Sequence, residues 1–195
     1  MTGKAGASAR SRAVILQAAL DLCAEQSYAA VTMEAIATRA RVGKPTLYRW
    51  WPSKGMLILE AVTERLGEPY FTIPDTGDLA TDIRTWIHTV TTIFTEEELR
   101  GILAGVVGSA QHDPDLAAIL HTQVHIPLSE RNRERIRAAQ EHGQMAGLDP
   151  YLMEDMLVAP LWYRLLITGQ PIDSTYADMV VDAVINATSE PSRDH

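Results

Sequence analysis

Residues 32–54 read TMEAIATRARVGKPTLYRWWPSK, and this stretch decides the fold of the first part of the chain. Thr32 can cap a first short helix, whose apolar face is formed by Ile36 and neighbouring alanines. Gly43 and Pro45 then start a second helix, because proline is favoured in the first turn. The second helix has only about two turns and cannot fold alone, since helix nucleation is costly. The pattern therefore predicts a helix-turn-helix whose outward side chains are free to contact DNA.

Charge is distributed unevenly along the chain. Residues up to Lys54 include eight lysines and arginines and three acidic residues, a net charge of +5, whereas the whole chain carries −8 and the remainder therefore −13. A basic end on an acidic remainder is typical of a protein that touches nucleic acid with one part only. The first part of the chain is thus the expected DNA-contacting region.

Length and composition limit the remaining choices. The chain has 195 residues, 46% of them hydrophobic, which is enough for a buried core and for one or two domains. Cys23 is the single cysteine and falls on an apolar helix face, so we expect a buried thiol and a reducing compartment. We see no signal-peptide pattern and no run of membrane-spanning length. We therefore expect a soluble, cytoplasmic protein with no membrane partner.

Apolar residues recur at helical spacing over the rest of the chain, between segments rich in Gly, Pro and Asp. No stretch shows the period of two that is typical of strands. We therefore expect an all-α fold, with an N-terminal three-helix domain that contains the helix-turn-helix and a larger C-terminal helical domain. Pro127 and Pro160 should each kink a helix. Beyond the two short helices, the predicted helices cover residues 10–26, 54–66, 78–94, 96–111, 115–143, 149–168 and 174–188.

The first part of the chain resembles the DNA-binding domain of TetR-family transcriptional regulators, of the TetR/AcrR type. The resemblance rests on residues that match in register without a gap: Arg12, Ile15, Leu16, Ala18, Ala19, Leu22, Tyr28, Thr32, Ile36, Ala37, Ala40, Val42, Pro45, Thr46, Leu47, Tyr48, Trp51, Ser53 and Lys54. The later run APLWYRLLITG at residues 159–169, with Pro171, is similar to the C-terminal domain of one large bacterial subgroup.

Three positions depart from the family pattern. Ser27 and Arg41 stand where the family usually has glycine, the residue that adopts a left-handed backbone without strain. Gly43 replaces the common capping serine. We expect the motif to tolerate these changes, with strain at Ser27 if its backbone is left-handed.

The resemblance implies a DNA-binding regulator that works as a homodimer. In this interpretation the chain represses transcription from a palindromic DNA operator, and a small-molecule effector of unknown identity releases it by changing the spacing of the DNA-binding heads. The expected segments are a flexible basic arm at 1–9, the helix-turn-helix domain at 10–54, a connecting helix and linker at 55–77, and the effector-binding and dimerisation domain at 78–190.

Residue chemistry indicates how the second short helix would contact DNA. Lys44 can donate to guanine acceptors or to phosphate, and Tyr48, one turn later on the same face, offers a phenol to a phosphate. Thr46 offers a hydroxyl and a methyl group to a thymine. Pro45 lies with them at the helix end that usually enters the major groove. The resemblance adds Thr32 and Lys54 as phosphate contacts.

Other residues of this region leave alternatives open. Trp50 can press on a thymine methyl or stack on a sugar, or it can merely pack against Trp51 or the linker. Leu47 and Trp51 are expected to point inward. Arg10, Arg12 and Arg41 are expected to contact phosphates or supply a diffuse field, whereas Arg49 is expected to face solvent.

The last two predicted helices carry persistent apolar stripes that must be buried. An intramolecular core is one explanation, and the resemblance instead pairs the two helices with their copies in a four-helix dimer interface. Two-fold symmetry would match two half-sites of a palindrome. The candidate dimerisation residues are Leu152, Met156, Tyr163, Ile167, Tyr176, Met179, Val180, Ala183 and Val184.

An effector pocket is expected among the middle helices, where large side chains mix with a few polar ones. The candidate lining residues are Trp86, Ile93, Phe94, Leu103, Val107, His121, His125, Met153 and Trp162. His121 and His125 have a spacing that can bind a metal, but no carboxylate or thiol completes a set, so we expect them at a polar pocket entrance and expect no metal or cofactor. The arginines at 131, 133, 135 and 137, interleaved with Glu130 and Glu134, are expected to form a solvated face.

Two other classes of function compete with a repressor. An enzyme is disfavoured because the sequence has no nucleophile signature, no phosphate-binding glycine loop and no convincing metal set, so no catalytic residues are assigned. A transcriptional activator, or a DNA-binding protein without an effector, remains the alternative. A large apolar second domain is not expected in an architectural protein that only bends DNA.

Overall fold

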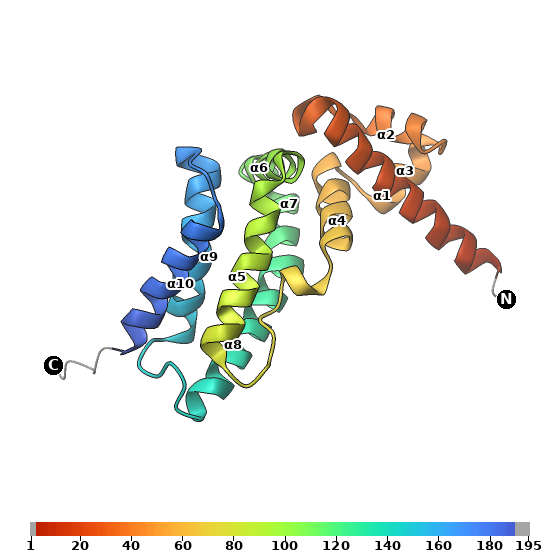
Figure 1. Cartoon of the computed structure of the whole chain (residues 1–195). Helices are drawn as coiled ribbons and strands as arrows, with labels where there is room; N and C mark the ends of the chain where they lie inside the picture. Colours follow the sequence, from red (N-terminus) through yellow and green to blue (C-terminus); the bar gives the residue numbers. More distant parts are fainter. Residues whose placement is uncertain (1–2, 190–195) are drawn as a thin grey trace. The chain divides into compact units, whose positions relative to one another are not determined.

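The computed structural model describes residues 3–189, and throughout this range the chain is helical without any β-strand (Figure 1), which confirms the all-α prediction. No helix in this range is long and apolar enough to span a membrane. The chain divides into two compact units. Unit 1 contains the residues up to Leu66 together with 101–121, and unit 2 contains 67–100 and the residues from 122 onward.

Unit 1 is built around the first four helices, which are α1 (Gly3–Ala30), α2 (Met33–Arg39), α3 (Lys44–Trp50) and α4 (Lys54–Leu66). Helix α1 packs against α4 and α2, and α2 packs against α3. Most of α6 (Glu97–Ala110) and all of α7 (Pro114–Ile119) also belong to this unit. The fully buried side chains of its core include Ile15, Ile36, Leu47, Leu57, Ile58, Ile102 and Leu116.

Helix α1 starts earlier than the sequence predicted. A flexible arm was expected at residues 1–9, but α1 begins at Gly3, while residues 1–2 lie outside the described range. The segment contains Ala5, Ala7 and Ala9, and alanine has the highest helix propensity, so the helix extends towards the N-terminus. Cys23 on this helix is buried, as predicted.

Backbone strain marks both positions where the chain lacks the family's glycine. Ser27 has φ 72° and ψ 156° and kinks α1 near its end, and Arg41 has φ 55° in the turn between α2 and α3. Positive φ places the side chain of an L-residue close to its own backbone, and the φ/ψ pair of Ser27 is one that glycine alone adopts readily. The sequence-based expectation of strain at Ser27 is confirmed.

Two glycines of unit 1 let neighbouring helices approach closely. A Cβ atom on Gly105 of α6 would lie 2.3 Å from Cδ1 of Tyr28, and a Cβ atom on Gly55 of α4 would lie 2.4 Å from Cδ2 of Leu116. The Tyr28 hydroxyl also donates a hydrogen bond of 2.8 Å to Oγ of Ser109. The end of α1 is therefore fixed to α6 by both close packing and a polar contact.

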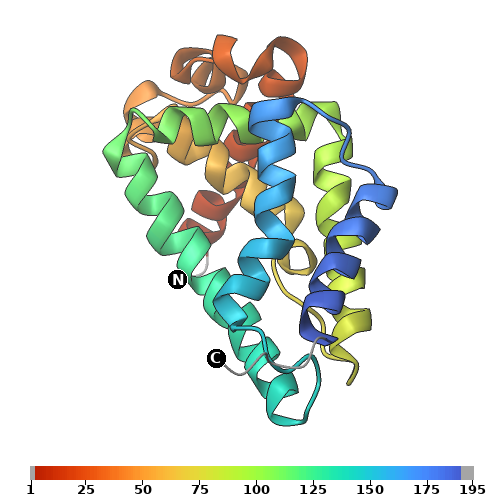
Figure 2. The same ribbon diagram turned by 90° about the vertical axis from the view of Figure 1, so that its left-hand side faces the viewer.

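Unit 2 contains α5 (Leu79–Thr95), α8 (Ile126–Glu141), α9 (Pro150–Tyr163) and α10 (Ser174–Ser189), with a short 3₁₀ helix, η1, at Glu68–Tyr70. Helix α10 packs against α5 and α9, and α8 packs against α9 (Figure 2). Asp78 and Asp149 cap α5 and α9 by accepting hydrogen bonds from backbone amides.

Two π-helical segments modify the predicted long helices. The helix expected at 115–143 is divided into α7, the π-helical segment η2 (Leu120–His125) and α8, and the helix expected at 149–168 ends in the π-helical segment η3 (Arg164–Thr168). Pro127 is the second residue after η2, and Pro160 lies one turn before η3. A π-turn is one way in which a helix accommodates an interruption of its regular hydrogen bonds.

Side chains of α8 hold the irregular segment that leads into α5. Asn132 accepts a hydrogen bond of 2.9 Å from the amide of Ile73 and donates one of 3.1 Å to the carbonyl of Phe71. Arg135 donates to the Pro74 carbonyl and, at 2.7 Å, to Oδ2 of Asp82. These bonds satisfy backbone groups that have no partner within a helix, so they fix the path of residues 71–74.

The prediction that the arginines of α8 form a solvated face is wrong for part of the set. Arg133 is 8% exposed, and its guanidinium lies 4.0 Å from the ring of Tyr151. Arg135 is bonded to Asp82, of which only 1% is exposed. Arg131 matches the expectation, because its ion pair with Glu68 is open to solvent. Arginines two residues apart on a helix point in different directions, which lets them tie α8 to different neighbours.

Candidate nucleic-acid interface

Helix α2 is set in place by a capped start and a buried face. Oγ1 of Thr32 accepts a hydrogen bond of 3.1 Å from the amide of Ala35, and the Thr32 backbone is extended, as an N-cap requires. Ile36 and Ala37 lie on the buried face of α2. Thr32 itself is exposed, so its predicted phosphate contact is sterically open at the start of α2.

Helix α3 follows after the turn and shows two distinct faces. Leu47 and Trp51 are buried, at 0% and 3% exposure, which confirms the prediction that they point inward. The exposed face of α3 carries Tyr48, whose side chain is 45% exposed. A helix of seven residues gains its stability from such packing, because an isolated helix of this length is unstable.

Most of the predicted base- and phosphate-contacting residues lie together on α3. Lys44 and Pro45 are exposed in its first turn, and Thr46 is half-buried beside them. Gly43 precedes the helix without a side-chain cap. The exposed surface of α3 thus combines an ammonium group, a hydroxyl and a phenol within two turns.

Lys44 already has a partner. Its Nζ atom lies 3.0 Å from Oε1 of Glu34 in the first turn of α2, and this hydrogen bond holds the pKa of the Glu34 carboxyl below its usual value. Glu34 was not predicted from the sequence. No sequence periodicity connects it with Lys44, because the two residues come from different helices that meet across the turn.

Lys54 points into the fold rather than away from it. Its Nζ atom donates to the carbonyls of Tyr28, at 2.8 Å, and Ala29, at 3.4 Å, and lies 4.5 Å from the centre of the Tyr28 ring. Burial lowers the pKa of its ammonium group. Lys54 thereby satisfies carbonyls at the end of α1, where the kink at Ser27 interrupts the regular helix.

Trp50 adopts the packing alternative. Its ring centre lies 5.5 Å from that of Trp51, with an interplanar angle of 84°, and the guanidinium of Arg49 lies 5.8 Å from the Trp50 ring. Such edge-to-face contacts stabilise aromatic pairs. Trp50 stays half-buried, so packing on Trp51 leaves part of the ring available.

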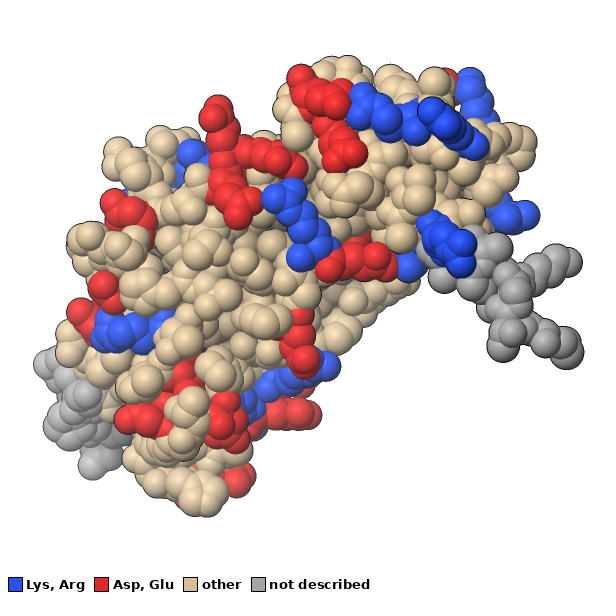
Figure 3. Space-filling model, turned by 45° about the vertical axis from the view of Figure 1, so that its right-hand side comes forward, with Lys and Arg blue, Asp and Glu red and all other residues tan. Residues whose placement is uncertain are grey.

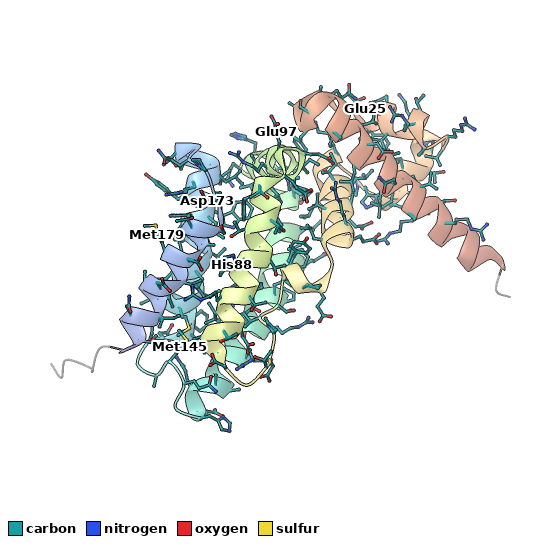
Figure 4. The ribbon with its side chains drawn as sticks, in the orientation of Figure 1. Glu25, His88, Glu97, Met145, Asp173 and Met179 are labelled. Atoms are coloured by element: carbon teal, nitrogen blue, oxygen red, sulfur yellow. The ribbon has the colours of Figure 1, made fainter. Side chains whose placement is uncertain are left out.

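Other cations of unit 1 differ in how strongly they are held. Arg39 forms two hydrogen bonds, of 2.9 and 2.6 Å, with the carboxylate of Glu25, the residue of α1 that Figure 4 labels. Arg12 pairs with two carboxylates of α4, those of Glu60 and Glu64. Arg10, Arg41 and Arg49 are exposed. Figure 3 shows Lys and Arg side chains interspersed with Asp and Glu rather than in one uniform patch.

Some of the candidate effector residues lie in the buried interior of unit 2. Phe94 and Trp162 make an edge-to-face contact with ring centres 5.6 Å apart, and Met153 is fully buried. Trp86 is buried and donates from Nε1 to the carbonyl of Tyr70 at 3.3 Å. Ile93 is also buried.

The remaining effector candidates are placed differently. Leu103 and Val107 are half-buried on the part of α6 that belongs to unit 1, and His121 and His125 are exposed at the two ends of η2. Within residues 3–189 no group of three or more His, Cys, Asp or Glu side chains is arranged to hold a metal ion. An open cavity of about 360 Å³ in unit 2 shares only Trp86 with the predicted set and is lined by Glu68, Pro69, Thr72, Pro74, Thr85, Trp86 and Thr89.

The candidate dimerisation residues divide into exposed and buried groups. Tyr163, Ile167 and Met179 are 58%, 71% and 63% exposed, and the side chain of Met179 extends outward from α10 (Figure 4). Leu152 and Ala183 are also exposed, and Met156 and Tyr176 are half-buried. Val180 and Val184 are buried within the chain, where α10 packs against α5 and α9.

Comparisons with known proteins agree with this arrangement of helices. Residues 15–61 match the bacterial regulatory proteins of the tetR family, and residues 73–184 match the tetracyclin repressor-like C-terminal domain. The chain is 33% identical over 183 residues to the uncharacterised HTH-type transcriptional regulator YdeS of Bacillus subtilis (strain 168), which covers 90% of this chain and 89% of that protein. It is 26% identical over 182 residues to the DNA-binding transcriptional repressor TetR of Mycobacteroides abscessus, with 92% and 94% covered.

A solved structure also has the same fold over most of its length. The TetR family transcription regulator SCO0332 aligns with a TM-score of 0.76 and 31% identity, over 91% of this chain and 97% of its own. Salmonella enterica GusR, at 18% identity, shares the fold with a TM-score of 0.71 over 93% and 96% of the two chains. The chain therefore belongs to the TetR family of transcriptional regulators and carries the family's DNA-binding helix-turn-helix.

Proposed function

We propose that the chain is a transcriptional repressor that binds a palindromic operator as a homodimer and is released by a small-molecule effector. The observation that carries the proposal is the exposed face of α3, with Lys44 and Tyr48 outward and Leu47 buried beneath them. A short helix packed on one side and polar on the other is suited to enter the major groove with its N-terminal residues.

Each residue of this face has a distinct role in the proposal. Lys44 donates to a guanine edge or to a phosphate, and Thr46 reads a thymine through its methyl group and hydroxyl. Tyr48 and Thr32 contact phosphates and fix the orientation of α3. Pro45 lies in the first turn, at the helix end that enters the major groove. Lys54 acts indirectly, by holding the end of α1 through the Tyr28 carbonyl.

Dimerisation is supported by apolar side chains that unit 2 leaves uncovered. Large exposed hydrophobic residues occur along α9, η3 and α10, whereas Met153, Leu157 and Val181 of the same helices are buried. Contiguous exposed apolar surface is typical of an interface between proteins. The proposed interface residues are Leu152, Met156, Tyr163, Leu166, Ile167, Tyr176, Met179 and Ala183.

An effector role is supported by the composition of the interior of unit 2. The aromatic pair Phe94–Trp162 and buried polarisable side chains such as Met153 suit an apolar or aromatic small molecule. Repression as the outcome is supported by the relative from Mycobacteroides abscessus, which is named a transcriptional repressor. Activation of transcription is the alternative.

The test is a binding titration with fluorescent duplexes taken from the DNA that flanks the coding region. We expect saturable, salt-sensitive and sequence-dependent binding, which Tyr48→Ala weakens for every duplex by removing a phosphate contact. Thr46→Ala should instead change the preferred base at one position by ~1–3 kcal/mol. An equal loss on all operator variants would contradict a base-reading role for Thr46. Lys54→Ala is unsuitable as a control, because this change also frees the end of α1.

A reporter fused to the bound segment separates repression from activation. Deleting the gene should raise expression of the reporter if the protein is a repressor. A fall in expression would support an activator and contradict the proposed sign of regulation.

A further inference from the structure

The ion pair between Glu34 and Lys44 lies on the surface that the proposed function turns towards DNA. Glu34 is in the first turn of α2, two residues after Thr32, and Lys44 is the first residue of α3. Both side chains are about half exposed, at 52% for Glu34 and 57% for Lys44. The ammonium group proposed to contact DNA is thus held by a carboxylate that is open to the same solvent.

The ion pair between Glu34 and Lys44 is weak enough to break when another anion competes for Lys44, although its atoms lie within hydrogen-bonding distance. Exposed ion pairs add little stability, because water screens the attraction and two long side chains lose freedom. Lys44 can therefore leave Glu34 for a phosphate or a base edge. The Glu34 carboxylate then remains unpaired beside a polyanion, and it stays charged at neutral pH because a glutamate carboxyl ordinarily titrates well below neutral pH.

We propose that Glu34 is a specificity-determining residue that competes with DNA for the Lys44 ammonium and so weakens sequence-independent binding. The inference rests on the proposed function, in which α3 contacts DNA through Lys44. Sequence-independent binding depends almost wholly on cations that neutralise phosphates, so a competing carboxylate lowers it directly. A sequence that also offers base-edge hydrogen bonds to α3 is less affected.

The other paired glutamates of unit 1 bind cations that lie outside α3. Glu25 pairs with Arg39 at the last residue of α2, and Glu60 and Glu64 pair with Arg12 on α1. Within the described residues, Glu34 is the acidic side chain that hydrogen-bonds to α3. A change at Glu34 therefore alters the partner of a proposed DNA-contacting cation and leaves the other ion pairs in place.

The experiment measures binding to a random-sequence duplex at low salt, so that no operator has to be known. Glu34→Gln should bind about fivefold more tightly than the wild type, and the gain should shrink as salt rises. In the Lys44→Gln background the same change should bring a much smaller gain, because only the repulsion between Glu34 and the phosphates is then relieved. The matched control is Asp115→Asn in α7, which removes one negative charge from an exposed residue of the same unit and should leave the affinity unchanged.

Three results would overturn the inference. An equal gain with and without Lys44 would show simple repulsion between Glu34 and phosphates, and no gain or a loss would show that the pair orients Lys44 for binding. A Glu34 carboxyl pKa that does not rise in Lys44→Gln, measured by NMR without DNA, would show that the pair does not form in solution.

The failure of the proposed function has a different signature. If neither Lys44→Gln nor Tyr48→Ala weakens binding, α3 does not contact DNA and both proposals fall. If both changes weaken binding but Glu34→Gln has no effect, the proposed function stands and the role of Glu34 alone is contradicted.

Discussion

The two units of the molecule use the same ion-pair chemistry for different purposes. In unit 1 the pairs Glu34–Lys44 and Glu25–Arg39 are open to solvent at the ends of the short helices α2 and α3. In unit 2 the Asp82 carboxylate is buried and bonded to Arg135 and to Thr76. Exposed pairs can exchange partners, as a DNA-contacting surface requires, whereas a buried pair fixes the chain around it.

The backbone shows the same difference. Unit 1 places strained φ angles at Ser27 and Arg41 next to its helix-turn-helix and relies on close helix contacts at Gly55 and Gly105. Unit 2 instead uses side chains of α8 to bond the irregular segment before α5. We therefore expect substitutions to lower stability mainly by removing buried polar contacts in unit 2 and mainly by disturbing helix packing in unit 1.

The largest effect is expected for Asp82→Asn in unit 2. Removing one partner of a buried pair leaves the Arg135 charge poorly compensated, so the free energy of unfolding should fall by about 3 kcal/mol. Urea unfolding followed by circular dichroism measures this loss. The control Asp75→Asn removes an exposed partner of the same arginine, which lies 3.0 Å away, and should change little. Equal effects of the two changes would contradict the distinction between buried and exposed pairs.

The same substitution should change the dependence of stability on pH. Burial raises the pKa of Asp82, but hydrogen bonds from Thr76 and the charge of Arg135 outweigh it and hold the folded-state pKa below the usual 3.8. The stabilisation by Asp82 is thus complete above the unfolded-state pKa and is lost as pH falls through the folded-state pKa. Unfolding midpoints measured downward from neutral pH should fall less steeply for Asp82→Asn than for the wild type.

The next effect is expected for Gly105→Ala in unit 1. The added methyl group would overlap the Tyr28 ring near Cδ1 and Cγ, and such overpacking costs about 1–3 kcal/mol. Gly108→Ala on the same helix is the control, because no neighbouring atom lies within 4 Å of the position that its new methyl group would occupy, and alanine has a higher helix propensity. Thermal unfolding should show a lower midpoint for the first variant and a raised midpoint for the second.

Local sequence signals predicted the helices and their caps, because these depend on neighbouring residues. Thr32 caps α2, α4 ends before Gly67, and Leu47 and Trp51 are buried as their spacing indicated. The π-helical segments were not predicted, since they depend on how each helix packs. The burial of Arg133 was also missed, because a charged residue with acidic neighbours at helical spacing is most often exposed.

The candidate site was predictable only in part, for the same reason. The exposure of Lys44 and Tyr48 follows from the position of the buried Leu47 on the same helix. Nothing local shows that Lys54 turns towards the Tyr28 carbonyl or that Glu34 holds Lys44, because both contacts join different helices. Long side chains have many rotamers, and the fold decides which of them finds a partner.

A smaller, stabilising effect is expected for Ser27→Gly. Glycine relieves the strain of this positive-φ conformation, which is almost exclusive to glycine and costs an L-residue on the order of 1 kcal/mol or more. The free energy of unfolding should therefore rise by about that amount in urea titrations. Ala24→Gly, at an exposed regular position of α1, is the control and should lower stability. A destabilised Ser27→Gly would contradict the assigned backbone conformation.

The smallest effect on stability is expected for Glu25→Gln, which breaks the pair with Arg39. Both side chains are exposed, so the unfolding midpoint should hardly change and should depend little on salt. A loss of stability as large as that of Asp82→Asn would show that exposed pairs of unit 1 are structural, and the comparison between the units would then fail.

The central claim is that the exposed face of α3 reads a specific DNA sequence. Selection of random duplexes by the purified chain, followed by sequencing, tests it most directly, with Tyr48→Ala selected in parallel. We predict enrichment of a palindrome with two half-sites about one helical turn apart or more, and weaker binding to the same palindrome by the variant, which lacks a phosphate contact. A failure to enrich any palindrome over repeated rounds would contradict the claim.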